Sequence, residues 1–83
     1  MEKNNPEYKV YPNPSTGKFF LSVSDPERVK QVDVFDLRGN KIKTYQNGFG
    51  FPLEVDLTGQ AKGSYLIKVS EAEMAEELRI ILK

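Results

Sequence analysis

The sequence predicts an all-β domain, an antiparallel sandwich or barrel, from two observations. Apolar and polar residues alternate in short runs, which is the two-residue period of a half-buried strand. Clusters of Gly, Pro, Asn, Asp and Ser separate these runs and mark turns. With 83 residues, of which 39% are hydrophobic, the chain has room for one domain with a single core.

Two strands are expected in the first part of the chain. Residues 1–9 are polar and broken by Pro6, which suits a linker or tail, and a short strand is counted where this segment ends, over residues 7–11. Residues 18–23 alternate between apolar and polar side chains, as a half-buried strand does. The residues that share the apolar face of this second strand are Phe19, Leu21 and Val23.

The next part of the chain is typical of a β-hairpin. Residues 29–36 alternate again, and residues 41–46 form the returning strand. Between them, residues 36–40 read DLRGN, the composition of a type I turn followed by a left-handed glycine. Gly39 suits that position because glycine takes a positive φ without steric cost.

Two more strands follow a loop. Residues 47–52 contain two glycines and a proline, and we expect them to form the loop. Residues 53–57 alternate, and residues 64–70 alternate again after a turn over residues 58–63. The residues expected to face inward are Leu53, Val55, Leu57, Tyr65, Ile67 and Val69.

The C-terminal segment supports two interpretations. Apolar residues at helical spacing, and a capping box formed by Ser70 and Glu73, favour a helix. The alternative is a short helical turn over residues 71–75 before a last strand over residues 77–82. The inward residues of that strand would be Leu78, Ile80 and Leu82. Two adjacent β-branched isoleucines, and the need to cover the last edge of an all-β domain, favour the strand.

The composition excludes several classes of function. The chain contains no Cys, His or Trp, which rules out disulfides, zinc sites and acid–base mechanisms that use imidazole. Lys and Arg balance Asp and Glu at twelve each, which argues against nucleic-acid binding because that function needs a basic surplus. No apolar run is long enough to cross a bilayer or to act as a signal peptide, so we expect a cytosolic protein or a piece of a longer chain.

The remaining acidic residues give no sign of a catalytic or metal site. Glu54 and Asp56 share a strand face, which on its own would permit a carboxylate pair or a calcium site. No third ligand follows at a suitable spacing, so a solvated outer face is the preferred interpretation. We therefore expect no cofactor, no metal and no enzyme activity, since no group of residues supplies an acid, a base and a nucleophile together.

Five segments carry a resemblance to a known family. In chain order they are residues 10–17 (VYPNPSTG), 34–39 (VFDLRG), 55–57 (VDL), 63–65 (GSY) and 79–83 (RIILK). In this order and spacing they resemble the type IX secretion system (Por secretion system) C-terminal sorting domain, type A, found in proteins exported by Bacteroidetes. The resemblance covers residues 10–83, and residues 1–9 are then a linker or tail.

The resemblance implies both a fold and a role. The fold is an immunoglobulin-like antiparallel β-sandwich of about seven strands, which adds weight to the C-terminal strand. The role is to direct an attached passenger protein through the periplasm and across the outer membrane to the cell surface or the medium. The implied partners are the passenger, the type IX outer-membrane translocon and a surface sortase that removes the domain, which we expect to cut within residues 2–9.

Three of these segments hold the candidate recognition residues. The candidates are Pro12, Asn13, Pro14, Gly17, Gly63, Tyr65, Arg79, Ile80, Ile81, Leu82 and Lys83. The first segment is explained by a rigid turn in which Gly17 supplies a special backbone angle, although a rigid loop also loses little entropy on binding. Tyr65 is expected to be buried with its hydroxyl bonded, as in a tyrosine corner. Residues 79–83 would offer a translocon an accessible edge for strand addition, or a terminal carboxylate.

The alternative function is an immunoglobulin-like accessory module. Phe49 and Phe51 lie in a glycine-flanked loop, where exposed aromatic rings bind carbohydrate or protein, although phenylalanine more often folds back to cap a core. Such a module would hold carbohydrate, a partner protein or a second copy of itself through these rings or through an open sheet edge.

Overall fold

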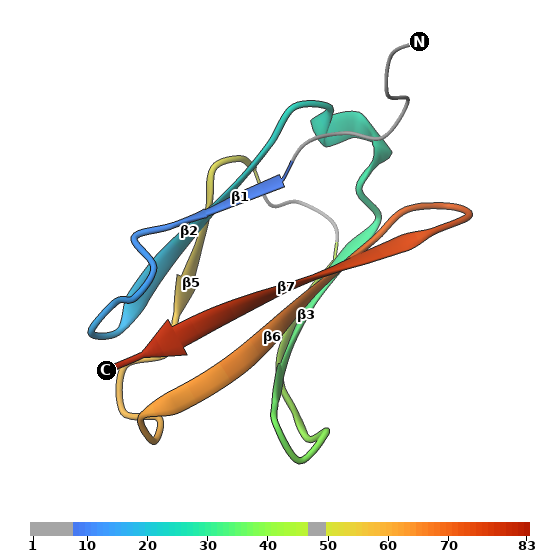
Figure 1. Cartoon of the computed structure of the whole chain (residues 1–83). Helices are drawn as coiled ribbons and strands as arrows, with labels where there is room; N and C mark the ends of the chain where they lie inside the picture. Colours follow the sequence, from blue (N-terminus) through green and yellow to red (C-terminus); the bar gives the residue numbers. More distant parts are fainter. Residues whose placement is uncertain (1–7, 47–49) are drawn as a thin grey trace, which may run out of the picture.

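The computed structural model of the protein describes residues 8–46 and 50–83 (Figure 1). Within these residues the chain forms seven β-strands and one turn of 3-10 helix, η1, at Pro26–Arg28. The strands are β1 (Tyr8–Tyr11), β2 (Lys18–Val23), β3 (Gln31–Asp36), β4 (Lys41–Gln46), β5 (Leu53–Asp56), β6 (Gly63–Ser70) and β7 (Ala75–Leu82). They make two antiparallel sheets, in the orders β1-β2-β5 and β4-β3-β6-β7, and the predicted β-sandwich is confirmed.

The core lies between the two sheets and is built from the apolar face of each. The alternation of inward and outward residues is confirmed in β2, β5, β6 and the second half of β7. The core residues are Phe19, Leu21, Val32, Val34, Leu53, Val55, Leu57, Tyr65, Ile67, Val69, Ile80 and Leu82. A slip of one residue in any strand pairing would turn these side chains to solvent, so the core fixes the register.

The C-terminal segment is a strand, and the helical turn expected over residues 71–75 is wrong. β7 is eight residues long and pairs with β6 along its whole length. The connection between them is a tight turn, in which the Glu71 N–H donates to the Met74 carbonyl over 2.7 Å. Local helix propensity is thus overridden by the backbone hydrogen bonds and the burial that pairing with β6 supplies.

The β3–β4 hairpin has the turn that its sequence predicts. Gly39 has a φ of 93°, the left-handed conformation expected there. The Asp36 N–H donates to the Asn40 carbonyl over 3.0 Å and closes the connection. The Asp36 carboxylate accepts from the backbone N–H groups of Asn40 and Arg38, and these hydrogen bonds lower its pKa below the ordinary value.

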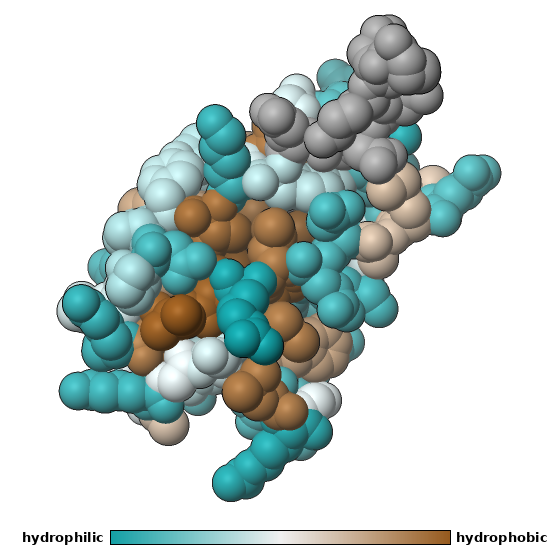
Figure 2. Space-filling view, in the orientation of Figure 1, coloured by the Kyte–Doolittle hydropathy of each residue, from teal (hydrophilic) through white to brown (hydrophobic). Residues whose placement is uncertain are grey.

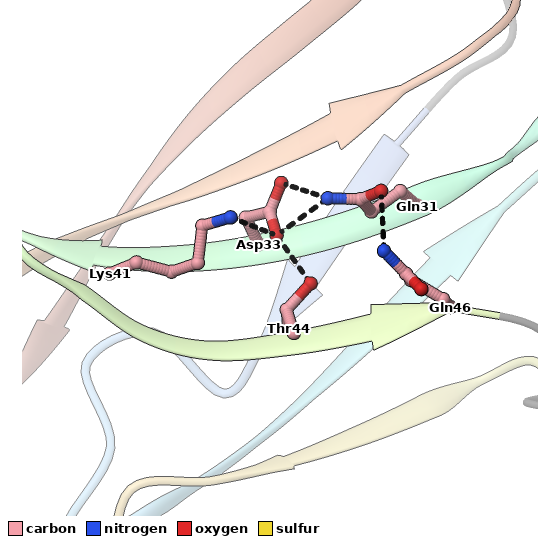
Figure 3. Close-up of polar contacts among 5 residues, drawn as sticks. All are labelled: Gln31, Asp33, Lys41, Thr44 and Gln46. Atoms are coloured by element: carbon pink, nitrogen blue, oxygen red, sulfur yellow. Dashed lines mark hydrogen bonds and ion pairs between the residues drawn. The ribbon is translucent and has the colours of Figure 1, made fainter.

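A polar cluster on the outer face joins β3 to β4 (Figure 3). The Asp33 carboxylate accepts from Thr44 over 2.6 Å and from the Gln31 amide over 3.0 Å, and the Lys41 ammonium lies 3.6 Å away. Gln46 donates to Gln31 over 3.0 Å. Burial alone would raise the pKa of Asp33, but these hydrogen bonds and the Lys41 charge hold it below the ordinary value. Because the partners come from both strands, the cluster also favours this one register.

The connections gather at the two ends of the sandwich (Figure 1). The proximal end carries Tyr8, where the described chain begins, together with η1 and the turn between β6 and β7. The distal end carries the loop of residues 12–17, the β3–β4 turn and the end of β7. The molecule measures 39 × 23 × 23 Å along its principal axes, so the long axis separates these two ends.

Candidate recognition surface

The three candidate segments, distant in sequence, meet at the distal end. β6 and β7 run side by side, so that Gly63 lies opposite Leu82 and Tyr65 lies opposite Ile80. The loop of residues 12–17 lies along the other edge of β7 and forms a parallel bridge to it. The structure therefore brings the loop and the end of the last strand into one place.

Asn13 connects the loop to β7 with its side chain. Its amide group donates to the Arg79 carbonyl over 3.1 Å, and its side-chain oxygen accepts from the Ile81 N–H over 3.0 Å. A carboxamide has the same donor and acceptor as a peptide group, so Asn13 takes the place of a residue in a neighbouring strand. The two bonded residues lie 66 and 68 positions further along the chain.

Ser15 continues the same edge with its backbone. Its N–H donates to the Ile81 carbonyl over 3.0 Å, and its carbonyl accepts from the Lys83 N–H over 2.8 Å. Its hydroxyl donates to the Lys18 carbonyl over 2.6 Å and accepts from the Gly17 N–H over 3.1 Å, which shapes the loop from within. Ser15 is 7% exposed.

These contacts correct the expected mode of recognition. The sequence predicts an accessible edge for strand addition at residues 79–83, but Asn13 and Ser15 occupy four backbone groups of that edge. These are the Arg79 carbonyl, the N–H and carbonyl of Ile81, and the Lys83 N–H. The loop acts as a short extra strand, one of the ways in which proteins cover a sheet edge. A partner can therefore add a strand beside residues 79–83 only by displacing the loop.

Gly17 is needed for space, and the special backbone angle expected for it is wrong. The glycines with positive φ in the described part of the chain are Gly39, Gly59 and Gly63. A Cβ atom on Gly17 would lie 3.1 Å from the Thr58 hydroxyl, closer than ordinary van der Waals contact. The Gly17 carbonyl also accepts from the Leu57 N–H over 2.8 Å. Gly17 thus lets the loop pack against the turn that follows β5.

Tyr65 and Gly63 have the structural roles expected for them. Tyr65 is 5% exposed, and its hydroxyl donates to the Ala61 carbonyl four residues earlier, the arrangement of a tyrosine corner. Gly63 has a φ of 141°, at the bend where the chain enters β6. Tyr65, Ile80 and Leu82 lie in the core, so their side chains support the distal end from inside.

The remaining candidates are exposed and form a loop–strand surface, which we define as Pro12, Asn13, Pro14, Arg79, Ile81 and Lys83. Ile81 keeps 42% of its area exposed, although it lies in the middle of the bonded edge. Figure 2 shows apolar surface on both sides of β7, interrupted by hydrophilic side chains. The surface therefore offers a partner fixed backbone, one apolar side chain and two cations.

The proximal end holds a charged cluster that the sequence did not reveal. The Glu71 carboxylate is 3% exposed, lies 3.4 Å from the Arg28 guanidinium and accepts a hydrogen bond from the Tyr8 hydroxyl. Burial and the neighbouring carboxylate raise the pKa of Tyr8, which keeps its phenol protonated. These contacts tie β1 to the β6–β7 turn and to η1, and so hold the start of β1 in place.

The other residues considered for binding have ordinary structural surroundings. Glu54 lies 3.5 Å from Lys18, and both side chains are about half exposed, so the expected solvated face is confirmed. A hydrogen bond from Thr58 lowers the pKa of Asp56. Among residues 8–46 and 50–83, no group of three acidic side chains is placed to hold a metal ion.

The structure describes only part of the aromatic loop proposed for the accessory module. Phe49 lies outside the described residues. Phe51 is partly buried and packs against the hydrophobic core, so the capping role preferred from the sequence is confirmed for this ring. Carbohydrate binding through an exposed Phe51 is not consistent with that position.

Comparison with known protein families gives a match to most of the chain. A family described as the secretion system C-terminal sorting domain matches residues 9–83. A search of the curated proteins finds no match. No helix in the described part of the chain is long and apolar enough to cross a membrane. The matched residues include both ends of the sandwich and the whole loop–strand surface.

Proposed function

This chain belongs to the secretion system C-terminal sorting domain family, and we propose that the outer-membrane translocon of the type IX system binds its folded distal end. A type IX sorting domain is attached to a passenger and is a signal for export to the cell surface or the extracellular space. In this proposal the passenger crosses the periplasm, and a surface sortase then cuts the chain within residues 2–9, before or at the start of β1. The domain is the substrate of that cut and performs no chemistry of its own.

The observation that carries the proposal is the loop–strand surface. Its two segments are 66 residues apart in sequence, yet the Asn13 side chain and the Ser15 backbone hold them together by bonding backbone groups of β7. The surface therefore exists only in the folded domain and is already ordered before a partner arrives. Preorganisation of this kind lowers the entropic cost of binding.

The position of the surface also favours recognition. A passenger joined to this chain through residues 1–7 leads into Tyr8 at the proximal end. The loop–strand surface lies at the distal end, beyond the length of the strands (Figure 1). A bulky passenger would therefore leave the surface open to the translocon.

The mode we propose is recognition of a folded surface, with the loop in place. Strand addition beside residues 79–83 would first have to break the bonds from Asn13 and Ser15. Side-chain contacts from Pro12, Pro14, Ile81 and the two cations need no such opening. The binding energy then comes from these side chains and from the fixed shape of the loop.

A secretion assay tests this function. A reporter protein is fused in front of the full 83-residue chain and expressed in a bacterium with a type IX secretion system, and the reporter is measured in the medium and in the periplasm. Ile81→Thr and Arg79→Glu change exposed side chains and leave the core intact, so we expect a folded domain and a fall in export of about tenfold. Lys30→Glu, at an exposed position of the proximal end, is the matched control and should export normally.

Two results would count against the proposal. If the unaltered fusion stays in the periplasm, the chain is not sufficient as a signal. If Ile81→Thr and Arg79→Glu both export as well as Lys30→Glu, the loop–strand surface is not what the translocon binds. Mass spectrometry of the released reporter tests the cut separately, since a new C-terminus at or after Lys9 would exclude a cut within residues 2–9.

A further inference from the structure

The outer face of the four-stranded sheet departs from the usual alternation of polar and apolar residues. An antiparallel sheet that faces solvent normally shows polar residues on that side. Here Phe35 of β3 lies opposite Leu66 of β6, and both are only partly buried. Ile81 of β7 is diagonal to Leu66, because its direct partner is Ser64. Apolar side chains thus continue across three neighbouring strands.

Leu37 extends this apolar surface beyond the sheet. It lies in the β3–β4 turn, and 60% of its area is exposed, the largest exposed fraction among the large hydrophobic side chains of the described residues. It borders two hollows, one shared with Phe35 and Leu66 and one shared with Gly63 and Tyr65. We define the Leu37 patch as Phe35, Leu37, Leu66 and Ile81.

Charged groups surround the patch and are mostly positive. The Lys41 ammonium lies 6.0 Å from the centre of the Phe35 ring, Lys68 lines the hollow beside Leu66, and Arg79 lies opposite Leu66. The acids on this rim are Glu77, which lines the same hollow, Asp36, which is bonded within the turn, and Asp33, which lies 3.6 Å from the Lys41 ammonium. Arg38 and Lys62 line the second hollow, so the cations around the patch outnumber the acids. An apolar centre with a charged rim is the usual anatomy of a protein–protein interface.

We propose that the Leu37 patch is a docking surface for a protein partner that presents an apolar side chain among acidic groups. The proposal rests on the function proposed above, with the partner being a component of the secretion machinery. The patch shares Ile81 with the loop–strand surface and touches Arg79, so the two surfaces form one continuous interface. The hollow bordered by Leu37, Phe35 and Leu66 would receive the apolar side chain.

A second copy of the chain fits this patch less well than an acidic partner. Two copies packed face to face would place the Lys41, Lys68 and Arg79 rims against each other, and like charges across an interface are unfavourable. The passenger is a poor candidate too, because it is joined at the proximal end and the Leu37 turn lies at the distal end (Figure 1).

The test uses one residue of the patch and one residue of its rim, both outside the loop–strand surface. Leu37→Ser removes the most exposed apolar side chain, and Lys68→Glu reverses one charge of the rim. In the reporter fusion we expect each to lower export by about tenfold, and the pair to lower it further. Lys30→Glu, at an exposed position of the proximal end outside the patch, controls for the change of charge and should export normally. Leu37→Ser should fold, because Leu37 lies in an exposed turn. Lys68→Glu places a carboxylate opposite Asp33 and Glu77, so circular dichroism melts are used to compare export at a temperature where each variant is folded.

The outcomes separate this inference from the proposed function. If the unaltered fusion is exported and both Leu37→Ser and Lys68→Glu are exported equally well, the patch is not a docking surface and the sorting function stands. If the unaltered fusion is not exported, both fail. If sedimentation shows that the purified chain is a dimer and that Leu37→Ser makes it monomeric, a second copy covers the patch and the acidic partner is excluded.

Discussion

The two ends of the sandwich are closed by different interactions. At the proximal end, the side chains of Arg28 and Tyr8 converge on the buried carboxylate of Glu71. At the distal end, backbone groups and one carboxamide, that of Asn13, close the edge of β7. The proximal end therefore depends on charge and on the identity of a few side chains, whereas the distal end depends mainly on the path of the chain.

This difference suits the roles that we propose for the two ends. Where closure uses backbone groups, neighbouring side chains such as Arg79 and Ile81 are left pointing outward for a partner. Where closure uses side chains, as at the proximal end, their polar groups are already bonded within the domain and are less available to bind a partner. Substitutions at the two ends should accordingly separate stability from recognition.

Deletion of residues 80–83 should abolish the cooperative fold. It removes two core side chains, Ile80 and Leu82, and the last pairs of β7 with β6. Loss of one such side chain costs about 2 to 5 kcal/mol, and a chain of this size has about 4 to 12 kcal/mol of stability in total. Urea unfolding followed by circular dichroism measures the effect. Ile81→Thr, which changes an outward side chain, is the control and should lose less than about 0.5 kcal/mol. A cooperative transition in the deletion variant would show that the distal end is not part of the core.

Arg28→Ala should destabilise the proximal end by about 2 kcal/mol, because the buried Glu71 carboxylate loses its cation while Arg28 itself is half exposed. Lys30→Ala, at an exposed neighbouring position, should change the unfolding free energy by less than about 0.5 kcal/mol. Urea titrations of the two variants compare them directly. If export of the reporter fell in Arg28→Ala at a temperature where the domain is folded, the separation of roles between the ends would be refuted.

Asn13→Ala should cost about 1 to 2 kcal/mol, since it removes two hydrogen bonds at the distal edge. It also exposes the Arg79 carbonyl and the Ile81 N–H, so we expect concentration-dependent self-association through the edge of β7. Sedimentation velocity over a range of concentrations detects it. Thr16→Ala, an exposed residue of the same loop, should remain like the unaltered chain. An Asn13→Ala variant that is as stable and as monomeric as Thr16→Ala would mean that the carboxamide does not close the edge.

The smallest expected effect is a dependence of the unfolding free energy on pH. It comes from Asp33 of β3, which lies between the two ends of the sandwich. The pKa of Asp33 is lower in the folded chain than its ordinary value of about 3.9, so its contribution is present above that pH and is lost as the pH falls through the lowered pKa. At pH 7, Asp33→Asn should therefore have a free energy of unfolding up to about 1 kcal/mol lower than that of the unaltered chain. Between pH 7 and pH 2, its free energy of unfolding should fall by less than that of the unaltered chain. Urea titrations at the two pH values give the difference. Equal acid dependence in both proteins would indicate that the carboxylates of Asp36 and Asp56 account for it.

The strands could be predicted from the sequence because the alternation of apolar and polar residues within each strand is a local pattern. The alternation in residues 18–23, 53–57 and 64–70 is enough to place the inward residues, and the tyrosine corner follows from the position of Tyr65 near the start of a strand. The helical turn before β7 was wrong because helix propensity is also local, while the pairing with β6 that overrides it is not.

The sites were harder to predict because they join residues that are distant in sequence. Asn13 looks like an ordinary turn residue, and nothing near it indicates that its partners lie 66 and 68 residues away. Glu71 belongs to an acidic segment and reads as a solvent-exposed residue, although it is the most deeply buried carboxylate of the proximal end. The Leu37 patch does leave a signal, since Phe35 and Leu66 each place an apolar residue where the alternation calls for a polar one.

The length of the sandwich has a consequence for how a passenger would be handled. The body is 39 Å long, and its strands run from one end toward the other (Figure 1). A receptor bound at the distal end is thus separated from the first residue of β1 by a rigid spacer, whose length does not change with the size or shape of the cargo. The domain would then hold the first residue of β1 at the same distance from the receptor for every passenger.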